Sequence, residues 1–219
     1  MKFIDRLFIY LPFSYMWVLR RSLGNPETIL DLGCGDGSLI EFLANGKKWK
    51  VVGVDLFAKN VKFAKKRRLF VSVANMDVLK FVKQQALKKK KYDVVFCSQL
   101  IEHMERDKGE KLLAIIDRVA KQRIIMGTPR EFMEQPHEYL GNNPYQIHKS
   151  GWSIDDFKIR DYKVFGIGLH SLWSEEGLIR THNKIVVPFF LAVSFLLSPV
   201  VYFIPSFAAG ILCIKDVKK

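Results

Sequence analysis

Three acidic residues and a serine recur at similar intervals in the first half of the chain, each at or just after the end of a short apolar run. Asp31, Asp55 and Asp77 are 24 and 22 residues apart, and Ser98 follows 21 residues later. One acid at a strand end is a common cap. Three acids on consecutive strand ends indicate a single ligand pocket, because ligands of open α/β sheets bind beyond the carboxyl ends of the strands.

Three glycines follow the first of these acids in the segment ILDLGCGDGSL. The pattern is Asp31-x-Gly33-x-Gly35-x-Gly37, and glycines let a backbone turn sharply and pass close to a ligand. The third glycine comes one residue too early for the nicotinamide fingerprint G-x-G-x-x-G, and Ser38 stands where that fingerprint has its last glycine. The phosphate-binding pattern G-x-x-x-x-G-K-[ST] is absent as well. The loop therefore indicates a different cofactor.

Strand-like and helix-like segments alternate around this loop. The strand-like runs are almost continuously apolar, as expected of strands buried on both faces of a parallel sheet. Alternation of this kind predicts a doubly wound α/β domain. The predicted strands are residues 28–33, 50–55, 70–75, 92–98 and 123–128, and the predicted helices are residues 38–44, 59–69, 78–90 and 108–120.

Residues 25–130 resemble the class I S-adenosylmethionine-dependent methyltransferases, in particular their small-molecule subgroup (methyltransferase type 11/12-like). The resemblance rests on the D-x-G-x-G-x-G loop, on VVGVD ending at Asp55, on NMD ending at Asp77 and on YDVVFCSQLIEHM. It implies a Rossmann-like sheet of seven strands with the last strand antiparallel beside the sixth. The sixth strand is expected at residues 161–168, the seventh at 208–217, and an apolar helical insertion at 169–207.

The resemblance also implies S-adenosylmethionine as the cofactor. Asp55 would accept hydrogen bonds from both ribose hydroxyls, and Asp77 would accept one from the adenine amino group. Met76 would pack on the adenine ring, and Asp31 would hold the ammonium group through water or backbone. The complete set of expected cofactor-binding residues is Asp31, Gly33, Cys34, Gly35, Gly37, Asp55, Leu56, Met76, Asp77 and Ser98.

The methyl acceptor is less well defined by the sequence. Methyltransferases of this fold that act on DNA adenine or protein glutamine carry N/D-P-P-Y/F after the fourth strand, and Ser98 is followed here by Gln-Leu-Ile. The polar and aromatic segment 128–152 is expected to form a lid over the acceptor, because long irregular segments are often functional. The residues expected to line the acceptor pocket beneath it are Tyr139, Tyr145, His137, His148 and Trp152.

His103, His137 and His148 are the candidate general bases, which a hydroxyl acceptor would require. The competing interpretation of His103 is a turn residue that holds its loop together. His137 and Glu138 lack the second histidine of a zinc-binding helix, so no metal site is predicted.

Both ends of the chain are apolar. Residues 1–24 predict one or two amphipathic helices, and the absence of a small-residue cleavage site argues against export. Residues 185–214 contain no charge and are long enough to span a bilayer, but Pro188, Pro199 and Pro205 argue against one straight helix. Two interpretations remain open: peripheral or re-entrant membrane contact, and a buried helix followed by the last strand. The segments expected to touch a membrane are 1–21 and 185–207.

The formal net charge is +13, of which residues 1–91 contribute +12. A basic half suggests an anionic partner, either nucleic acid or a membrane surface. The alternative is that its lysines only form solvent-exposed faces of helices. The lysine-rich runs lack the interleaved aromatics that grip single-stranded RNA, so nucleic acid is the less favoured partner. Three scattered cysteines indicate reduced, buried thiols and a cytoplasmic environment.

These observations together predict a methyltransferase of a small-molecule or lipid-linked acceptor. Methylation at an oxygen is expected, in the cytoplasm and peripherally at the membrane face. Two alternatives remain, namely an RNA methyltransferase that uses the basic half and a non-catalytic partner subunit with this fold. The predicted organisation is an N-terminal helical segment (1–24) and a methyltransferase domain (25–219) that contains the lid and the apolar insertion.

Overall fold

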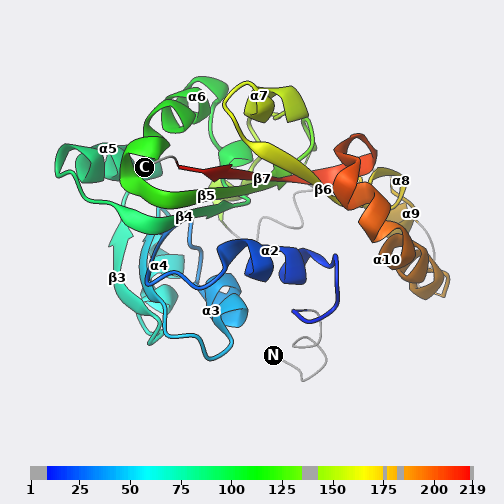
Figure 1. Cartoon of the computed structure of the whole chain (residues 1–219), viewed down its shortest axis with the longest axis horizontal. Coiled ribbons are helices and arrows are strands. Elements are labelled where there is room, and N and C mark those ends of the chain that lie inside the picture. Colours follow the sequence, from blue (N-terminus) through cyan, green and yellow to red (C-terminus); the bar gives the residue numbers. More distant parts are fainter. Residues whose placement is uncertain (1–8, 135–142, 175–176, 182–184, 218–219) are drawn as a thin grey trace.

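A seven-stranded sheet forms the centre of the molecule, with helices on both faces (Figure 1). The computed structural model describes residues 9–134, 143–174, 177–181 and 185–217. The strand order is β3-β2-β1-β4-β5-β7-β6, parallel except for β7, which is antiparallel to β5 and β6. The predicted methyltransferase sheet is confirmed. Its strands are β1 (Thr28–Leu32), β2 (Lys50–Asp55), β3 (Phe70–Asn75), β4 (Tyr92–Ser98), β5 (Ala120–Pro129), β6 (Lys163–Leu169) and β7 (Ala208–Asp216).

The two faces of the sheet bury separate hydrophobic clusters. Alternate residues of β1 point to opposite faces, so that Leu30 and Leu32 belong to one cluster and Ile29 to the other. The first cluster lies under α5 (Val78–Leu87), α6 (Arg106–Ile115) and α7 (Ile154–Lys158). The second lies under α2 (Tyr15–Leu23) and α3 (Ser38–Ala44), while α4 (Ala58–Ala64) packs beside β2 and β3. Burial on both faces explains why the strand sequences are almost continuously apolar.

Three helices end earlier than the sequence predicts, and backbone geometry supplies the reasons. After Lys65 the chain continues through turns in which the N–H groups of Lys66, Arg67 and Phe70 bond to the carbonyls three residues back. Beyond α5, Lys89 has a φ of +52°, which a right-handed helix does not allow. The predicted helix 108–120 becomes α6 followed by a 3-10 turn, η2 (Ile116–Val119).

The uncharged run before the last strand forms α10 (Val187–Phe203), a helix of 17 residues. Pro188 lies in its first turn, where a backbone N–H has no helical partner to lose, and Pro199 lies inside it. Pro205 opens the 3-10 turn η5 (Pro205–Phe207), which leads into β7. Two short helices, α8 (His170–Trp173) and α9 (Leu178–Thr181), precede α10. No helix in the described part of the chain is long and apolar enough to cross a membrane.

α10 packs against β6 at the edge of the sheet. Tyr202 stacks on Phe165 with ring centroids 4.6 Å apart. Gly166 permits this approach, because a Cβ there would lie 2.2 Å from the Val201 carbonyl oxygen. Trp173 of α8 donates a hydrogen bond from Nε1 to Ser194 Oγ of α10 at 2.7 Å. α10 therefore faces the sheet with one stripe of its surface, which leaves other sides of this apolar helix exposed.

Candidate active site

The glycine loop and the end of β2 are joined by backbone hydrogen bonds to one carboxylate. Oδ2 of Asp55 accepts from the Gly35 N–H at 2.9 Å, and Oδ1 accepts from the Phe57 N–H at 2.8 Å. An ideal Cβ on Gly35 would meet nothing within 4 Å, so this stretch of backbone borders open space. Gly37 turns the loop into α3 with a φ of +79°, and a Cβ there would lie 2.4 Å from the Phe70 ring.

Asp31 lies beside this loop and is only 4% exposed. Burial, and secondarily the charge of Asp55, raise the pKa of Asp31 to about 8. The pKa of Asp55 is also raised by burial, although its two backbone hydrogen bonds oppose that shift. Two carboxyl groups are therefore held in a desolvated corner where a cationic ligand group would stabilise their ionised forms.

A cavity of about 160 Å³ opens between the loop and the ends of β1 and β4. Five of the expected cofactor residues line it, and Asp55 bonds to its rim through Gly35. Leu56 is 42% exposed beyond the end of β2. The lining residues are Asp31, Gly33, Cys34, Gly35, Asp36, Ser38, Leu39, Phe96 and Ser98.

The expected adenine-binding pair lies at the end of the neighbouring strand. The Met76 N–H donates to the Asp55 carbonyl at 3.2 Å, which ties the end of β3 to the end of β2. Asp77 caps α5, because its Oδ1 accepts from the Lys80 N–H at 2.9 Å. Both residues stand where the sequence places them, and their contacts with adenine stay a prediction.

Tyr15, from the N-terminal segment, contacts Ser98, a residue that lines this cavity. Its hydroxyl lies 2.6 Å from Ser98 Oγ, and burial raises its pKa. Sequence reasoning missed this residue, since nothing in its spacing connects it with a strand end 83 positions away. The only available signal was the aromatic face of the predicted amphipathic helix.

A second, larger cavity of about 940 Å³ adjoins the first. The two share Ser38 and Leu39 as lining residues, and Gln99 and Thr128 contribute polar atoms at the ends of β4 and β5. The remaining walls are mostly apolar and come from the N-terminal segment, α3, the segment after β5, β6, α8, α10 and β7. They include Leu11, Phe13, Met16, Phe42, Met133, Ile167, Trp173, Leu191, Phe195 and Ile211.

Two of the candidate bases lie together next to a buried carboxyl group. The His103 and His148 rings are 4.8 Å apart, and Glu102 is 2% exposed. Burial raises the pKa of Glu102 to about 7, and burial and the neighbouring His148 lower the pKa of His103 to about 4. Both histidines are half-buried, so the pair stays accessible. His137, the third candidate, lies outside the described residues.

Comparison of the sequence with known proteins relates the part of the chain that carries this site to methyltransferases. Residues 29–123 match the family model described as "Methyltransferase domain". A curated relative, the ubiquinone biosynthesis O-methyltransferase of Serratia proteamaculans, is 32% identical over 95 residues, which are 42% of this chain and 39% of that protein. The match thus spans about two fifths of the relative's length. Residues 29–123 are thus similar in sequence to a methyltransferase domain.

Solved structures extend the likeness to nearly the whole fold. An S-adenosylmethionine-dependent methyltransferase from Archaeoglobus fulgidus aligns with a TM-score of 0.60 at 18% identity, covering 98% of this chain and all of that one. The N-methyltransferase NodS from Bradyrhizobium japonicum aligns with a TM-score of 0.55 at 12% identity, covering 98% and 99%. These structures share the fold of this chain. S-adenosylmethionine as the cofactor, like the roles assigned to single residues, remains a prediction.

Part of the segment predicted to form a lid lies beside the end of β2, and its role as a lid stays a prediction. Tyr145, in the 3-10 turn η4 (Pro144–Gln146), packs edge-on against Phe57 just past the end of β2, with ring centroids 6.5 Å apart. Tyr139 lies outside the described residues. The expectation that Trp152 lines the acceptor pocket is wrong, because this side chain is wholly buried.

The position of Trp152 has a packing explanation. Its Nε1 donates to Ser150 Oγ at 2.9 Å, and Arg106 lies over its ring at 4.0 Å. Gly109 of α6 leaves room for it, since a Cβ there would lie 2.4 Å from the indole. An aromatic residue in a polar segment thus anchors the lid to the core. The following helix, α7, begins with a capping box formed by Ser153 and Asp156.

Proposed function

We propose that this protein transfers the methyl group of S-adenosylmethionine to an oxygen of an apolar, lipid-like small molecule, and that it does so docked on a membrane surface. The observation that carries the proposal is the large apolar cavity that adjoins the cofactor pocket. Methyl transfer from a sulfonium depends mainly on alignment of donor and acceptor. The acceptor must therefore fit the space next to the cofactor, and the walls of that space define its chemistry.

The cavity combines a polar inner end with apolar walls. Gln99 and Thr128 stand at the strand ends, close to the cofactor loop, and are suited to hydrogen bonds with a polar head group. Farther out, Leu191 and Phe195 of α10 face Phe13 of the N-terminal segment across the space. Apolar walls with a few polar groups at one end are typical of sites for amphipathic small molecules. A polar head carrying an apolar chain matches both parts.

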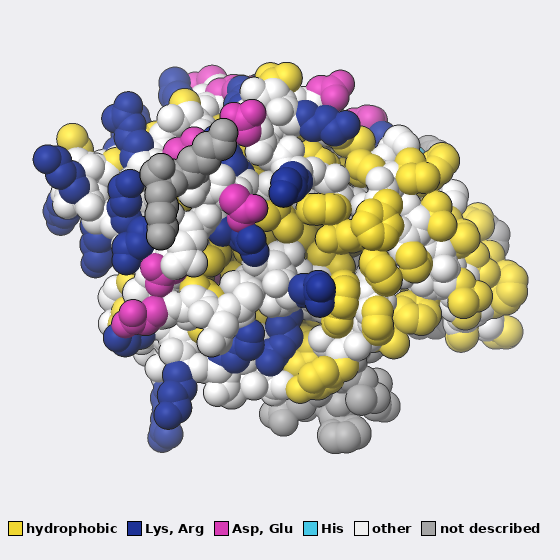
Figure 2. All heavy atoms as spheres, in the orientation of Figure 1, with side chains coloured by type: hydrophobic (Ala, Val, Ile, Leu, Met, Phe, Trp, Pro, Cys, Tyr) yellow, Lys and Arg dark blue, Asp and Glu magenta, His cyan; other side chains and the backbone are white. Residues whose placement is uncertain are grey.

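α10 supports the membrane part of the proposal. Its outer side chains are exposed and apolar, with Phe189 at 66%, Leu196 at 74% and Phe203 at 68% exposure. Figure 2 shows hydrophobic side chains gathered over the end of the molecule that α10 occupies in Figure 1. A contiguous apolar surface of this kind marks an interaction site. A helix of 17 residues extends for only about 26 Å, so we place it in the membrane interface rather than across it.

The N-terminal segment joins the same surface. Phe13 packs edge-on against Tyr202 and Phe203 at the end of α10, with centroid distances of 5.5 and 6.1 Å. Arg21 stacks over Trp17 at 5.3 Å from the ring centroid. Aromatic and arginine side chains are favoured at a membrane interface, where a basic residue contributes about 1 kcal/mol. The two ends of the chain thus build one surface beside the cavity.

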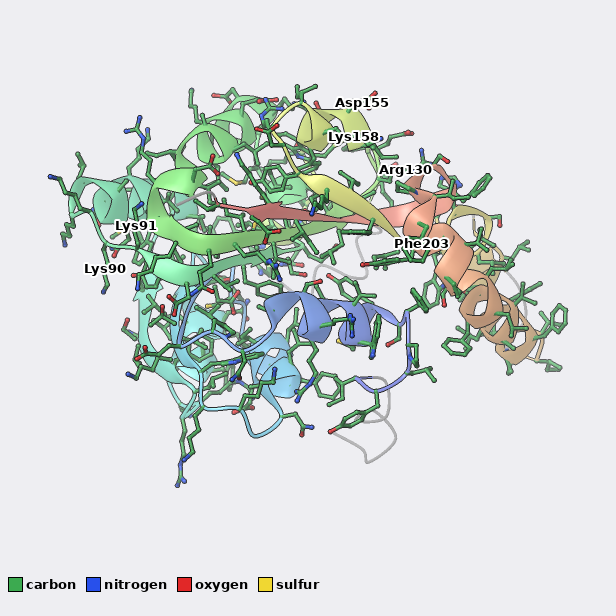
Figure 3. All side chains as sticks on the ribbon, viewed as in Figure 1. Lys90, Lys91, Arg130, Asp155, Lys158 and Phe203 are labelled. Atoms are coloured by element: carbon green, nitrogen blue, oxygen red, sulfur yellow. The ribbon has the colours of Figure 1, made fainter. Side chains whose placement is uncertain are left out.

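Not every basic residue expected near the membrane lies there. Lys215 is at the opposite end of β7 from α10, paired with Asp117 at the bottom of the sheet. Lys90 and Lys91 also lie at the far end of the molecule from Phe203 (Figure 3). Residues 1–8, Lys184 and the last two lysines fall outside the described residues. Apolar burial is therefore the main source of the binding that we propose.

The RNA alternative draws less support from this arrangement. A nucleic-acid substrate would have to bring its acceptor to the cavity while its phosphates contact basic residues. The run at Lys90 lies away from α10, whose apolar surface borders the cavity (Figure 3). The named activity of the Serratia relative, an O-methyltransferase of ubiquinone biosynthesis, also favours an oxygen acceptor on a small molecule.

A labelling assay tests the acceptor class. Purified protein is incubated with methyl-labelled S-adenosylmethionine and a cell extract separated into solvent-extractable lipids, RNA and protein. We expect label in the lipid fraction, and much less of it with an Asp55→Ala variant, whose affinity for the cofactor should be reduced. Label that is confined to RNA or protein would refute the lipid acceptor and leave the methyltransferase assignment standing.

A further inference from the structure

Glu102, His103 and His148 form a cluster that the cofactor site does not use. One ligand atom from each side chain lies within 4.8 Å of the other two. Glu102 and His103 are neighbours in the 3-10 turn η1 (Ile101–His103), whereas His148 belongs to the segment that follows η4. Backbone bonds join the two segments, because the Lys149 and Ser150 N–H groups both donate to the Glu102 carbonyl, at 2.7 and 3.1 Å.

The hydrogen bonds of the two rings determine which nitrogen is free. His103 Nδ1 lies 3.3 Å from the Ile147 carbonyl oxygen, and His148 Nδ1 contacts the Met133 carbonyl oxygen. A carbonyl can only accept, so both Nδ1 atoms carry the proton and both Nε2 atoms of the neutral rings keep a lone pair. A backbone carbonyl that accepts from the second ring nitrogen is also the usual way in which a metal-binding histidine is oriented.

The carboxyl group presents one oxygen without a partner. Glu102 Oε2 accepts from Thr128 Oγ1 at 3.0 Å. Glu102 Oε1 is buried and has no hydrogen-bond partner among the residues that the structure describes. A buried carboxylate oxygen left without a partner is unfavourable and calls for an explanation such as an ion. A cation bound at Oε1 would provide one.

We propose that Oε1 of Glu102 and the Nε2 atoms of His103 and His148 bind a divalent transition-metal ion. Two imidazoles and one carboxylate are the ligand set of catalytic zinc sites, which leave one position open, and imidazole nitrogens disfavour magnesium. Tetrahedral bonds of about 2.0–2.1 Å put ligand atoms roughly 3.3 Å apart. One ligand atom of each side chain already lies within 4.8 Å of the others, so these atoms have to approach by about 1.5 Å. Two half-buried histidines on irregular segments can shift and turn to bring their Nε2 atoms to the ion. This site revises the sequence-based expectation of no metal.

The open position of such an ion would lie next to the proposed acceptor cavity. Thr128, which bonds to Glu102, and Met133, whose carbonyl contacts His148, both line that cavity. An ion there could bind the acceptor oxygen and make its hydroxyl more acidic. This use of the ion rests on the proposed function, whereas the ion site itself rests only on the three side chains.

Metal binding is measured without reference to activity. Protein freed of metal with a chelator is titrated with Co²⁺, followed by visible absorption, and with Zn²⁺, followed by calorimetry. We expect one equivalent of each to bind to the wild type, with affinity reduced by at least about 10-fold in His103→Ala and in His148→Ala. His170→Ala is the matched control, because His170 is exposed and belongs to α8. It should bind like the wild type.

Binding of S-adenosylhomocysteine to each variant reports separately on folding and on the cofactor site. Unchanged affinity for this product shows that a variant is folded, whatever the acceptor proves to be. The metal proposal is overturned if the wild type binds neither ion stoichiometrically. It is also overturned if both folded histidine variants bind Co²⁺ and Zn²⁺ as tightly as the wild type.

Discussion

The Tyr15 hydroxyl lies 2.6 Å from the Ser98 hydroxyl, although 83 positions separate the two residues. Tyr15 opens α2, and Ser98 is the last residue of β4, where it lines the cofactor cavity. The contact therefore joins the N-terminal segment to a residue of the cofactor cavity. It also places Tyr15 between the two cavities, because this residue lines the larger one.

Removal of the Tyr15 hydroxyl should weaken cofactor binding. Tyr15→Phe keeps the ring but leaves Ser98 without its partner, and a hydrogen bond of this kind contributes about 0.5–1.5 kcal/mol. We expect a loss of about 2- to 12-fold in affinity for S-adenosylhomocysteine by calorimetry. Tyr10→Phe is the control, since Tyr10 is exposed and its hydroxyl only accepts from Asn45. Equal affinities of the two variants would show that the N-terminal segment does not support the cofactor site.

Asp55 is expected to be the strongest single determinant of cofactor affinity. Asp55→Ala removes the two backbone hydrogen bonds that shape the loop and the carboxylate predicted to bind the ribose. Loss of charge-assisted hydrogen bonds costs about 1.5–3 kcal/mol, or about 10- to 150-fold in affinity. Asp107→Ala, an exposed acid of α6 paired only with Lys111, is the control. Wild-type affinity in Asp55→Ala would refute the ribose assignment.

Asp31 should make the ligand-free protein less stable as the pH rises. Its pKa is about 8 in the folded chain, against an ordinary value of 3.8. Between these values the folded state binds a proton that the unfolded state has released, so the free energy of unfolding falls by at most about 1.4 kcal/mol per pH unit. This decrease in the free energy of unfolding is absent below about pH 4 and complete above about pH 8.

Urea unfolding at pH 5, 6.5 and 8 measures this effect. The wild type should lose stability relative to Asp31→Asn across that range, because the amide has no proton to release. Asp107→Asn should show no such divergence, since the pKa of Asp107 is lowered by its bond to Lys111 and it titrates below this range. Parallel curves for wild type and Asp31→Asn would show that the Asp31 carboxyl ionises freely in the folded protein.

How much the sequence could predict depends on the separation of the interacting residues. The glycine loop and Asp55 were predictable, because parallel strands bring their carboxyl ends together whatever lies between them. Tyr15 and His148 were not linked to their partners, because contacts across 83 and 45 positions depend on how whole segments pack. Trp152 was misjudged for a related reason. An aromatic in a polar segment gives no sign of whether it faces a ligand or the core.

The same limit applies to the C-terminal insertion. Lack of charge over residues 185–214 did not distinguish a membrane segment from a buried helix. The structure contains elements of both interpretations, because β7 is buried in the sheet while α10 exposes much of its apolar surface. Gly166 allows α10 to pack closely on β6, because a Cβ at this position would collide with the Val201 carbonyl oxygen. The sequence alone does not show that a helix packs against this glycine.

The exposed face of α10 should bind membranes, and two substitutions test it. Phe189→Ser combined with Leu196→Ser removes two exposed apolar side chains while leaving the buried stripe at Ser194 and Val201 intact. Each contributes about 1 kcal/mol on partial insertion, so liposome affinity should fall by about 30-fold. Leu87→Ser, at the end of α5, is the matched control, because Leu87 is 85% exposed and lies away from α10. Flotation with neutral and anionic liposomes measures the effect. If the wild-type protein binds liposomes of neither composition, docking on a membrane is contradicted. The exposed face of α10 would then be expected to pack against another protein.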